Sequence, residues 1–85
     1  MVTMSIEYRG KEIFAAHPDG TLWTDDVREA YAWDSYDSIS SIAQHFFRNL
    51  AIEVFGTKNI TESQFIYRSQ PDNRKLHYDP QLGWH

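Results

Sequence analysis

The stretch DSISSIAQHFFRNLAIEVFG, residues 37–56, decides the fold because it predicts one long helix in the middle of an 85-residue chain. Its apolar side chains recur at three- and four-residue spacing, which is the pattern of an amphipathic helix. They are Ile39, Ile42, Ala43, Phe46, Leu50 and Val54, and Phe47 and Ala51 widen the stripe. We expect the face formed by Ile39, Ile42, Phe46 and Leu50 to lie against the rest of the core.

Both ends of this helix carry sequence signals. Gly56 suits the C-terminal end, because the residue that follows a helix often adopts a left-handed conformation. Asp34 or Ser35 suits the N-terminal cap, because a short oxygen-bearing side chain accepts a hydrogen bond from the first turn. The predicted helix therefore covers about 36–55.

The residues before the helix read as strands. Residues 3–9 alternate between apolar and polar side chains, which predicts a strand buried on one face. Gly10 and Lys11 form the expected turn, and residues 12–17 form the partner strand. The HPDG sequence at 17–20 predicts a second turn, because proline fixes φ and Asp-Gly accepts the remaining geometry. A third strand is expected at 21–24.

Residues 25–33 fit either a short helix or a short strand, since two aspartates favour a helix start and AYAW favours a strand. After the helix, NITESQFIYR at 59–68 has β-branched and aromatic residues in strand proportions. SQPDN at 69–73 predicts a turn, and RKLHY at 74–78 alternates as its partner strand. These segments predict a second hairpin.

Two hairpins on either side of one helix, without a β-α-β repeat, predict an α+β fold in which the helix covers one face of an antiparallel sheet. A chain of this length forms one domain, residues 1–85. The tail from about residue 80 is expected to be mobile unless Leu82 and Trp84 dock.

Composition restricts the possible functions. The chain has no cysteine, which excludes disulfides, thiolate metal sites and cysteine nucleophiles. No apolar run has the roughly 18 residues that a membrane helix needs, and no secretion leader is recognisable, so we expect a cytoplasmic protein. A formal net charge of −4 with only eight Lys and Arg makes general nucleic-acid binding a poor fit. A basic partner matches this charge.

Catalytic and cofactor motifs are missing. None of the four histidines has a second ligand at zinc-site spacing, although His17 with Asp19 and His77 with Asp79 form close pairs in the sequence. The four glycines stand apart and form no phosphate loop. We therefore expect no enzyme activity, no metal and no cofactor.

The negative charge is concentrated in residues 19–37, which we call the acidic stretch. It holds six carboxylates and one arginine, interleaved with aromatic side chains. Caps at helix starts explain part of this cluster, but aromatic residues beside unpaired charge are also typical of binding interfaces. The predicted partner-binding residues are Asp19, Trp23, Asp25, Asp26, Glu29, Tyr31, Asp34, Tyr36 and Asp37.

The segments DGTLWT and DDVREAYAWDSYDSISSIAQHF lie within residues 19–55, where the chain resembles small proteins encoded by bacteriophages and mobile elements, among them the anti-CRISPR inhibitors. The resemblance lies in size, acidity, lack of cysteine and layout, and no residue-by-residue motif carries over. It implies a stoichiometric inhibitor that occupies a basic nucleic-acid or subunit-docking surface of a CRISPR effector.

Two further hypotheses remain. The first is a small nucleic-acid-binding module that uses basic residues and stacking aromatics; these are Arg68, Arg74, Lys75, Tyr67, Tyr78 and Trp84. The second is a dimeric structural protein that pairs an exposed strand edge or buries its remaining aromatic surface.

Overall fold

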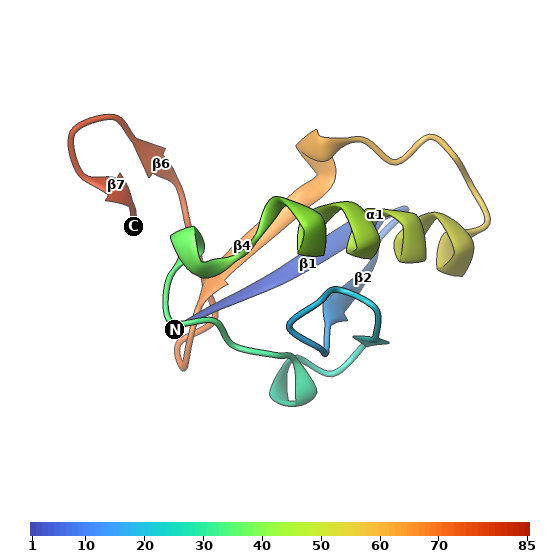
Figure 1. The fold of residues 1–85 in the computed structure, drawn as a ribbon, viewed down its shortest axis with the longest axis horizontal. Helices are drawn as coiled ribbons and strands as arrows, with labels where there is room; N and C mark the ends of the chain where they lie inside the picture. Colours follow the sequence, from blue (N-terminus) through green and yellow to red (C-terminus); the bar gives the residue numbers. More distant parts are fainter.

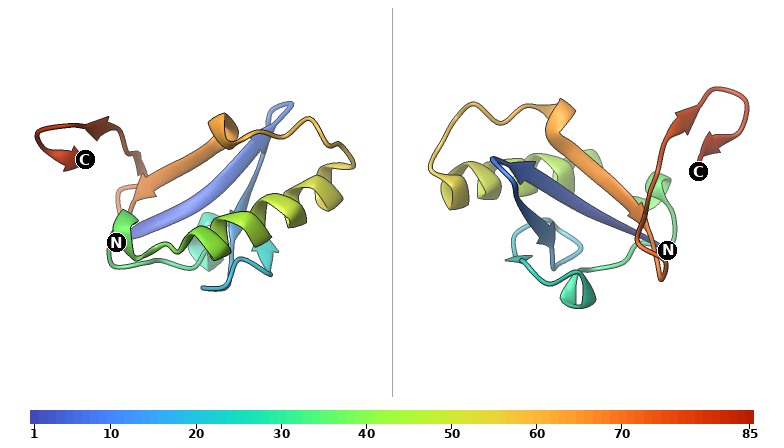
Figure 2. Two further views of the ribbon diagram at one scale, coloured as in Figure 1. Left: turned by 45° about the horizontal axis from the view of Figure 1, so that its top comes forward. Right: turned by 180° about the vertical axis from the view of Figure 1, so that it is seen from behind.

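The computed structural model describes residues 1–85 and has the predicted α+β architecture. The five strands of the main sheet are β1 (Val2–Tyr8), β2 (Lys11–Ala15), β3 (Trp23–Thr24), β4 (Phe65–Ser69) and β5 (Arg74–Lys75). They are antiparallel in the order β3-β2-β1-β4-β5, so the two hairpins join through β1 and β4. Helix α1 (Ser41–Phe55) lies along one face of the sheet (Figures 1 and 2).

A second, two-stranded sheet stands at one end of the molecule. Its strands are β6 (Tyr78–Asp79) and β7 (Gly83–Trp84), and we call this unit the C-terminal hairpin. Figure 1 shows it projecting from the end of the main sheet near the N-terminus, beyond the start of α1. The predicted strand 74–78 is therefore divided between two sheets, with β5 in one and Tyr78 in the other.

The first hairpin turns one residue earlier than the sequence predicts. Arg9 and Gly10 both have left-handed backbone conformations, with φ of 52° and 82°, and Tyr8 pairs with Lys11. Two successive residues with positive φ give a turn whose twist matches that of the flanking strands. Lys11 therefore belongs to β2 rather than to the turn.

Strand β1 is buried on both faces, which corrects the prediction of a half-buried strand. Met4 and Ile6 face the hydrophobic core, as the alternation predicts. Thr3 and Ser5, on the opposite face, are each only 1% exposed. Ser5 donates a hydrogen bond to Glu12, whose carboxylate also binds Arg68, so these longer side chains cover the small residues of the central strand.

Helix α1 ends as predicted but starts later. Gly56 is left-handed, with φ of 68°, and its N–H donates to the carbonyl of Ile52 at 2.9 Å. At the other end the cap is Ser40, whose Oγ accepts from the N–H of Ala43 at 3.0 Å, and not Asp34 or Ser35. Residues Tyr36–Ser38 form a separate 3-10 turn, η2. No helix of the chain has both the length and the apolar character required to cross a membrane.

The buried face of α1 differs in part from the predicted one: Leu50 packs against the core as expected, whereas Ile42 and Phe46 do not. Phe47 is 0% exposed, whereas its neighbour Phe46 is 45% exposed. The buried helix positions are Ala43, Phe47 and Ala51, and Ile42 joins Phe46 on the solvent side. The physical reason is close packing. The small side chains of Ala43 and Ala51 allow the helix backbone to lie near its neighbours on this face.

Gly20 shows this close approach directly. Its φ is 79°, and a Cβ at this position would collide with the carbonyl oxygen of Ala43. The turn predicted at 17–20 is present, with the N–H of Gly20 donating to the carbonyl of His17 at 3.0 Å. The turn at 17–20 therefore packs directly against the backbone of α1 near Ala43 and Phe47.

The ambiguous segment 25–33 contains elements of both predicted kinds. Val27–Glu29 form a 3-10 turn, η1, and Trp33 forms an isolated antiparallel bridge with Val2. The backbone of Trp33 donates to and accepts from Val2 at 2.8 and 2.7 Å. Trp33 is consequently part of the hydrophobic core.

Strand β4 begins at Phe65, later than the predicted start at residue 59. The residues before it include a 3-10 turn, η3 (Glu62–Gln64), and the N–H of Thr61 donates to Oε1 of Gln64 at 2.9 Å. The predicted turn at 69–73 is present, because β4 pairs antiparallel with β5 directly after it. In the tail, Trp84 packs against the body while Leu82 stays 73% exposed.

Candidate partner-binding site

Three of the six carboxylates in the acidic stretch have local hydrogen-bond partners, and Asp19 is the first. Its Oδ1 accepts from the N–H and the hydroxyl of Thr21 at 3.0 and 2.6 Å, and Nδ1 of His17 lies 2.6 Å away. The Thr21 hydroxyl and amide, followed by His17, hold the pKa of Asp19 below its ordinary value. This carboxylate mainly stabilises its own turn.

Asp26 and Glu29 are also bonded locally. Asp26 caps η1 by accepting from the N–H of Arg28 at 3.0 Å, and it pairs with the guanidinium of the same residue at 2.9 Å. These bonds to Arg28 lower the pKa of Asp26. Glu29 accepts from the hydroxyl of Thr24 at 3.0 Å. The predicted capping role therefore accounts for Asp26.

The other three carboxylates, of Asp25, Asp34 and Asp37, are exposed and have neither a side-chain hydrogen bond nor an ion pair. We call them the free acids. Asp34 and Asp37 flank Tyr36 and line a groove, whereas Asp25 lies outside it. The acidic stretch is thus divided between bonded turns and free charges.

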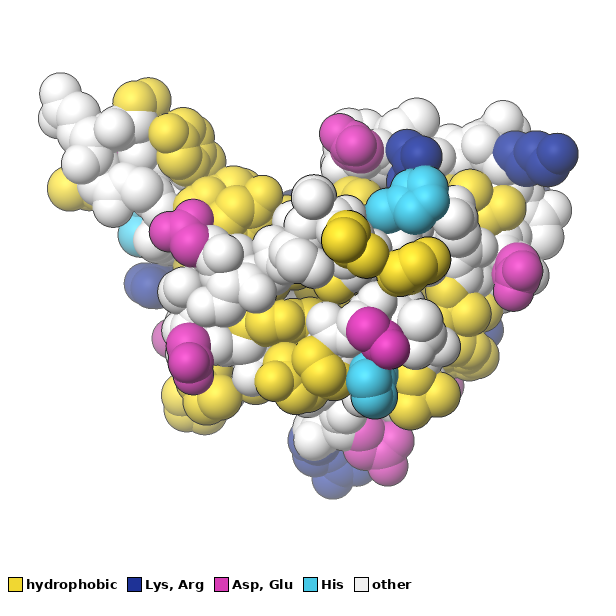
Figure 3. Space-filling view, viewed as in Figure 1, with side chains coloured by type: hydrophobic (Ala, Val, Ile, Leu, Met, Phe, Trp, Pro, Cys, Tyr) yellow, Lys and Arg dark blue, Asp and Glu magenta, His cyan; other side chains and the backbone are white.

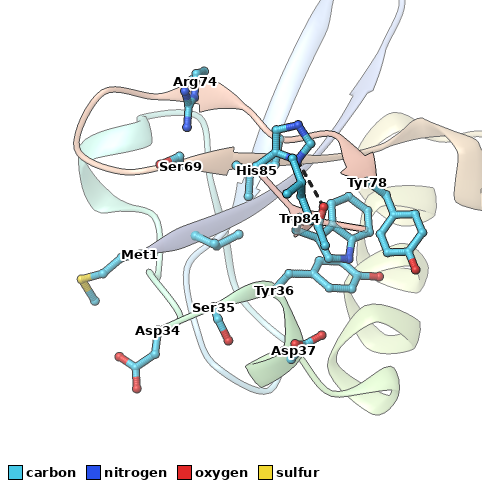
Figure 4. Close-up of a pocket in the computed structure, with 14 residues that line it drawn as sticks. Met1, Asp34, Ser35, Tyr36, Asp37, Ser69, Arg74, Tyr78, Trp84 and His85 are labelled. Carbon is cyan, nitrogen blue, oxygen red and sulfur yellow. Dashed lines mark hydrogen bonds between the residues drawn. The ribbon is translucent and has the colours of Figure 1, made fainter. Parts of the chain in front are cut away.

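The groove is lined by residues 34–37, by the C-terminal hairpin and by the neighbouring end of the main sheet, and it has a volume of about 720 Å³ (Figure 4). Its aromatic lining centres on Tyr36 and Trp84, whose rings stack with centroids 3.9 Å apart and an angle of 26° between their planes. Tyr78 adds a third ring, 5.5 Å from Trp84 and 63% exposed as a residue. Exposed aromatic surface and two free acids therefore line the same groove.

Tyr67, on β4, packs against both rings of the stacked pair Tyr36 and Trp84. Its ring meets Tyr36 edge-on with centroids 4.7 Å apart and lies 5.5 Å from Trp84. Burial, with a further contribution from Tyr36, raises the pKa of the Tyr67 hydroxyl. The stacked pair is thus fixed to the main sheet, and the C-terminal hairpin is held in place by Trp84.

The groove carries both signs of charge, on opposite sides. Figure 4 places Arg74 and His85 at one side and Asp34 and Asp37 at the other, with the aromatic rings of Tyr36 and Trp84 between them. Arg74 comes from β5, so the cation of the groove belongs to the main sheet, whereas His85 follows β7. The groove is therefore polarised.

The remaining predicted binding residues lie away from the groove. Trp23 packs against the core, with Nζ of Lys11 5.5 Å from its ring centroid. Tyr31 meets the ring of Trp33 edge-on at 4.7 Å. On the face shown in Figure 3 the acidic side chains stand apart from one another. The acidic stretch is not one continuous surface.

The predicted partner-binding residues leave out the C-terminal side of the groove. Leu76, Tyr78 and Trp84 line it together with Tyr36, although some forty residues separate them from it in sequence. Their signal was the run LHYDPQLGW, which has four apolar or aromatic residues that a disordered tail would not need. As binding residues, Tyr78 and Trp84 were named only by the nucleic-acid hypothesis.

The residues of that nucleic-acid hypothesis do not form one surface. Arg68 donates two hydrogen bonds of 3.2 Å to Glu12 on the sheet face opposite α1. Its guanidinium charge is therefore already paired and is less available to a phosphate. Arg74 lines the groove, whereas Lys75 lines a second, smaller hollow. Tyr67 is half-buried.

The histidines gather no metal-binding group. No set of three or more His, Asp or Glu side chains is arranged to hold a metal ion. His45 contacts Asn49 at 3.2 Å, one turn along α1. His17 is close to Asp19, in the turn described above.

Comparisons with known proteins return no match: no protein-family model, no curated protein and no solved structure matches this chain.

Proposed function

We propose that this chain is a non-enzymatic binding protein that docks on a basic surface of a partner protein. The observation that carries the proposal is the pair of free acids, Asp34 and Asp37, at the side of an aromatic groove. An exposed carboxylate without a local partner gains most from an incoming cation, and long-range attraction speeds the encounter. Aromatic side chains supply much of the binding energy at protein interfaces.

The partner is a protein that handles nucleic acid, such as a CRISPR effector. Such proteins concentrate lysine and arginine in the channels that hold the phosphate backbone. An acidic protein in such a channel excludes the nucleic acid, which makes the chain a stoichiometric inhibitor of the kind that phages encode. The net charge of −4 agrees with this role.

Capture with a matched variant tests the proposal. The tagged chain and a variant with Asp25, Asp34 and Asp37 changed to asparagine are incubated with a nuclease-treated bacterial lysate, and bound proteins are identified by mass spectrometry. We expect the parent to retain a nucleic-acid-handling protein that the variant loses and that added DNA or RNA displaces. Proteins captured equally by both forms, or not displaced by nucleic acid, would contradict the proposal.

Direct nucleic-acid binding is the second candidate, because Arg74 shares the groove with Tyr78 and Trp84. Aromatic stacking with a few cations suffices for a weak single-strand binder. Mobility-shift measurements at low salt with single-stranded RNA and with DNA separate the two functions. Tight binding by the chain alone would favour this second candidate over protein docking.

A further inference from the structure

We propose that the groove lined by residues 34–37 and the C-terminal hairpin binds an arginine side chain presented by an extended segment of the partner protein. This inference rests on the proposed function, since it names the group of the basic partner that the site recognises. It adds the C-terminal hairpin, through Tyr78 and Trp84, to a site that the acidic stretch forms only in part.

The aromatic rings favour a flat cation. A guanidinium group is planar and weakly hydrated, and it stacks on the faces of tryptophan and tyrosine better than a lysine ammonium does. Trp84 already stacks on Tyr36 at 3.9 Å, so its position is fixed before a ligand arrives. Tyr78 stands 5.5 Å from Trp84 and is largely exposed, which leaves ring surface for a ligand.

The charges select the sign and the direction of the ligand. Asp34 and Asp37 have no partner in the structure, so a bound guanidinium supplies the missing ion pair. Arg74 lies across the groove and repels a second cation there, which directs the arginine toward the two aspartates. The same charges disfavour a phosphate, because two carboxylates would repel it and only Arg74 would attract it.

The size of the groove indicates more than one residue of ligand. Its volume of about 720 Å³ lies within the range of roughly 300–1,000 Å³ that holds drug-sized ligands. An extended segment of a few residues fills such a space, with one arginine between the aspartates and the rings. The apolar side chain of Leu76 is available to contact its neighbours.

Nuclear magnetic resonance titration of the ¹⁵N-labelled full chain tests the inference. The probe is a short peptide of alternating glycine and arginine, and the control is the same peptide with citrulline, which keeps the shape but lacks the charge. We expect the arginine peptide to shift the indole N–H of Trp84 and the amides of residues 34–37. We expect the citrulline peptide to leave these signals nearly unchanged.

Two double variants make the test specific. D34N/D37N removes the charges inside the groove, whereas D25N/E53Q removes two exposed charges outside it. We expect the first to weaken peptide binding about fivefold at low salt, as two surface ion pairs would. The second should change binding by less than about twofold.

Three results would overturn the inference. They are equal weakening by both double variants, shifts centred on residues 25–29, and tighter binding of a thymidine oligonucleotide at the same groove. None of these excludes a basic partner, because the capture experiment with the triple variant tests that function separately. Capture of a partner whose binding withstands D34N/D37N but not the triple variant would likewise reject the groove and keep the proposed function.

Discussion

Phe46 and Phe47 are neighbours in sequence but occupy opposite environments, one at the solvent side of α1 and one in the core. Both belong to runs of apolar residues at helical spacing, so periodicity alone does not choose between them. The alanines at 43 and 51 are the distinguishing signal, because small residues on each side of a large one mark the face where a helix approaches its neighbours. Of the four residues predicted to face the core, Ile39 and Leu50 do so, whereas Ile42 and Phe46 are exposed.

Truncation of the two phenylalanines should therefore have different effects. Phe47→Ala should cost about 3–5 kcal/mol in the free energy of unfolding, since it opens a cavity in the core of a small domain. Phe46→Ala should cost less than about 1 kcal/mol, because much of this ring is already in water. Urea unfolding of both variants checks this, and equal losses would show that the helix is rotated from the face described here.

Acid stability should depend on Asp19. Its hydrogen bonds to Thr21 lower its pKa in the folded state, so its contribution is full above the ordinary value of 3.8 and is lost as the pH falls below it. Thermal melts of Asp19→Asn between neutral pH and about pH 2.5 should show a smaller decline than the parent. Asp25→Asn, which removes an exposed carboxylate with no local bond, is the control, and an identical decline in Asp19→Asn and the parent would refute the assignment.

At the scale of elements, signals confined to short stretches were predictable and long-range ones were not. Gly56 ends α1 as its sequence indicates, because the left-handed position needs only local geometry. The start of the helix was misplaced because Asp34, Ser35 and Ser40 all have cap chemistry, and the chain uses the first two for the segment beside the groove. The C-terminal hairpin depends on the contact of Trp84 with Tyr36, which no local pattern specifies.

The cap assignment gives a direct test. Ser40→Ala should lower the free energy of unfolding by about 1 kcal/mol, because the N–H of Ala43 loses its acceptor. Ser35→Ala should have a smaller effect, since the Oγ of Ser35 caps no backbone group. Chemical unfolding of the two variants side by side measures the difference. A greater loss from Ser35→Ala would place the helix start at the residue that the sequence suggested.

The C-terminal hairpin should open when its aromatic contact is removed. Trp84→Ala should lose roughly 0.5–1.5 kcal/mol of local stability from ring pairing, so amide hydrogens of residues 77–85 should exchange faster while those of β1 stay protected. Leu82→Ala is the matched control, because this side chain is 73% exposed. Unchanged exchange in Trp84→Ala would mean that the hairpin does not depend on the stack.

At the scale of the whole molecule, the sequence located the charge but not its division. The sequence shows an acidic protein whose acidic stretch, residues 19–37, also holds aromatic residues. Only the fold separates the bonded acids, such as Asp19 and Asp26, from the free ones, because hydrogen bonds to Thr21 and Arg28 depend on turn geometry. The fold also brings β6 and β7 to the segment 34–37, which completes the groove.

The rate of association with the captured partner tests the proposed function most directly. Two triple variants each remove three negative charges. One changes the free acids Asp25, Asp34 and Asp37 to asparagine, and the other changes the bonded acids by D19N, D26N and E29Q. We predict that the free-acid variant keeps its stability but associates about tenfold more slowly at low salt, with a flatter dependence on salt. The bonded-acid variant should lose stability while its folded molecules associate much faster than those of the free-acid variant. Equal association rates for the parent and the free-acid variant at low salt would contradict docking through these carboxylates.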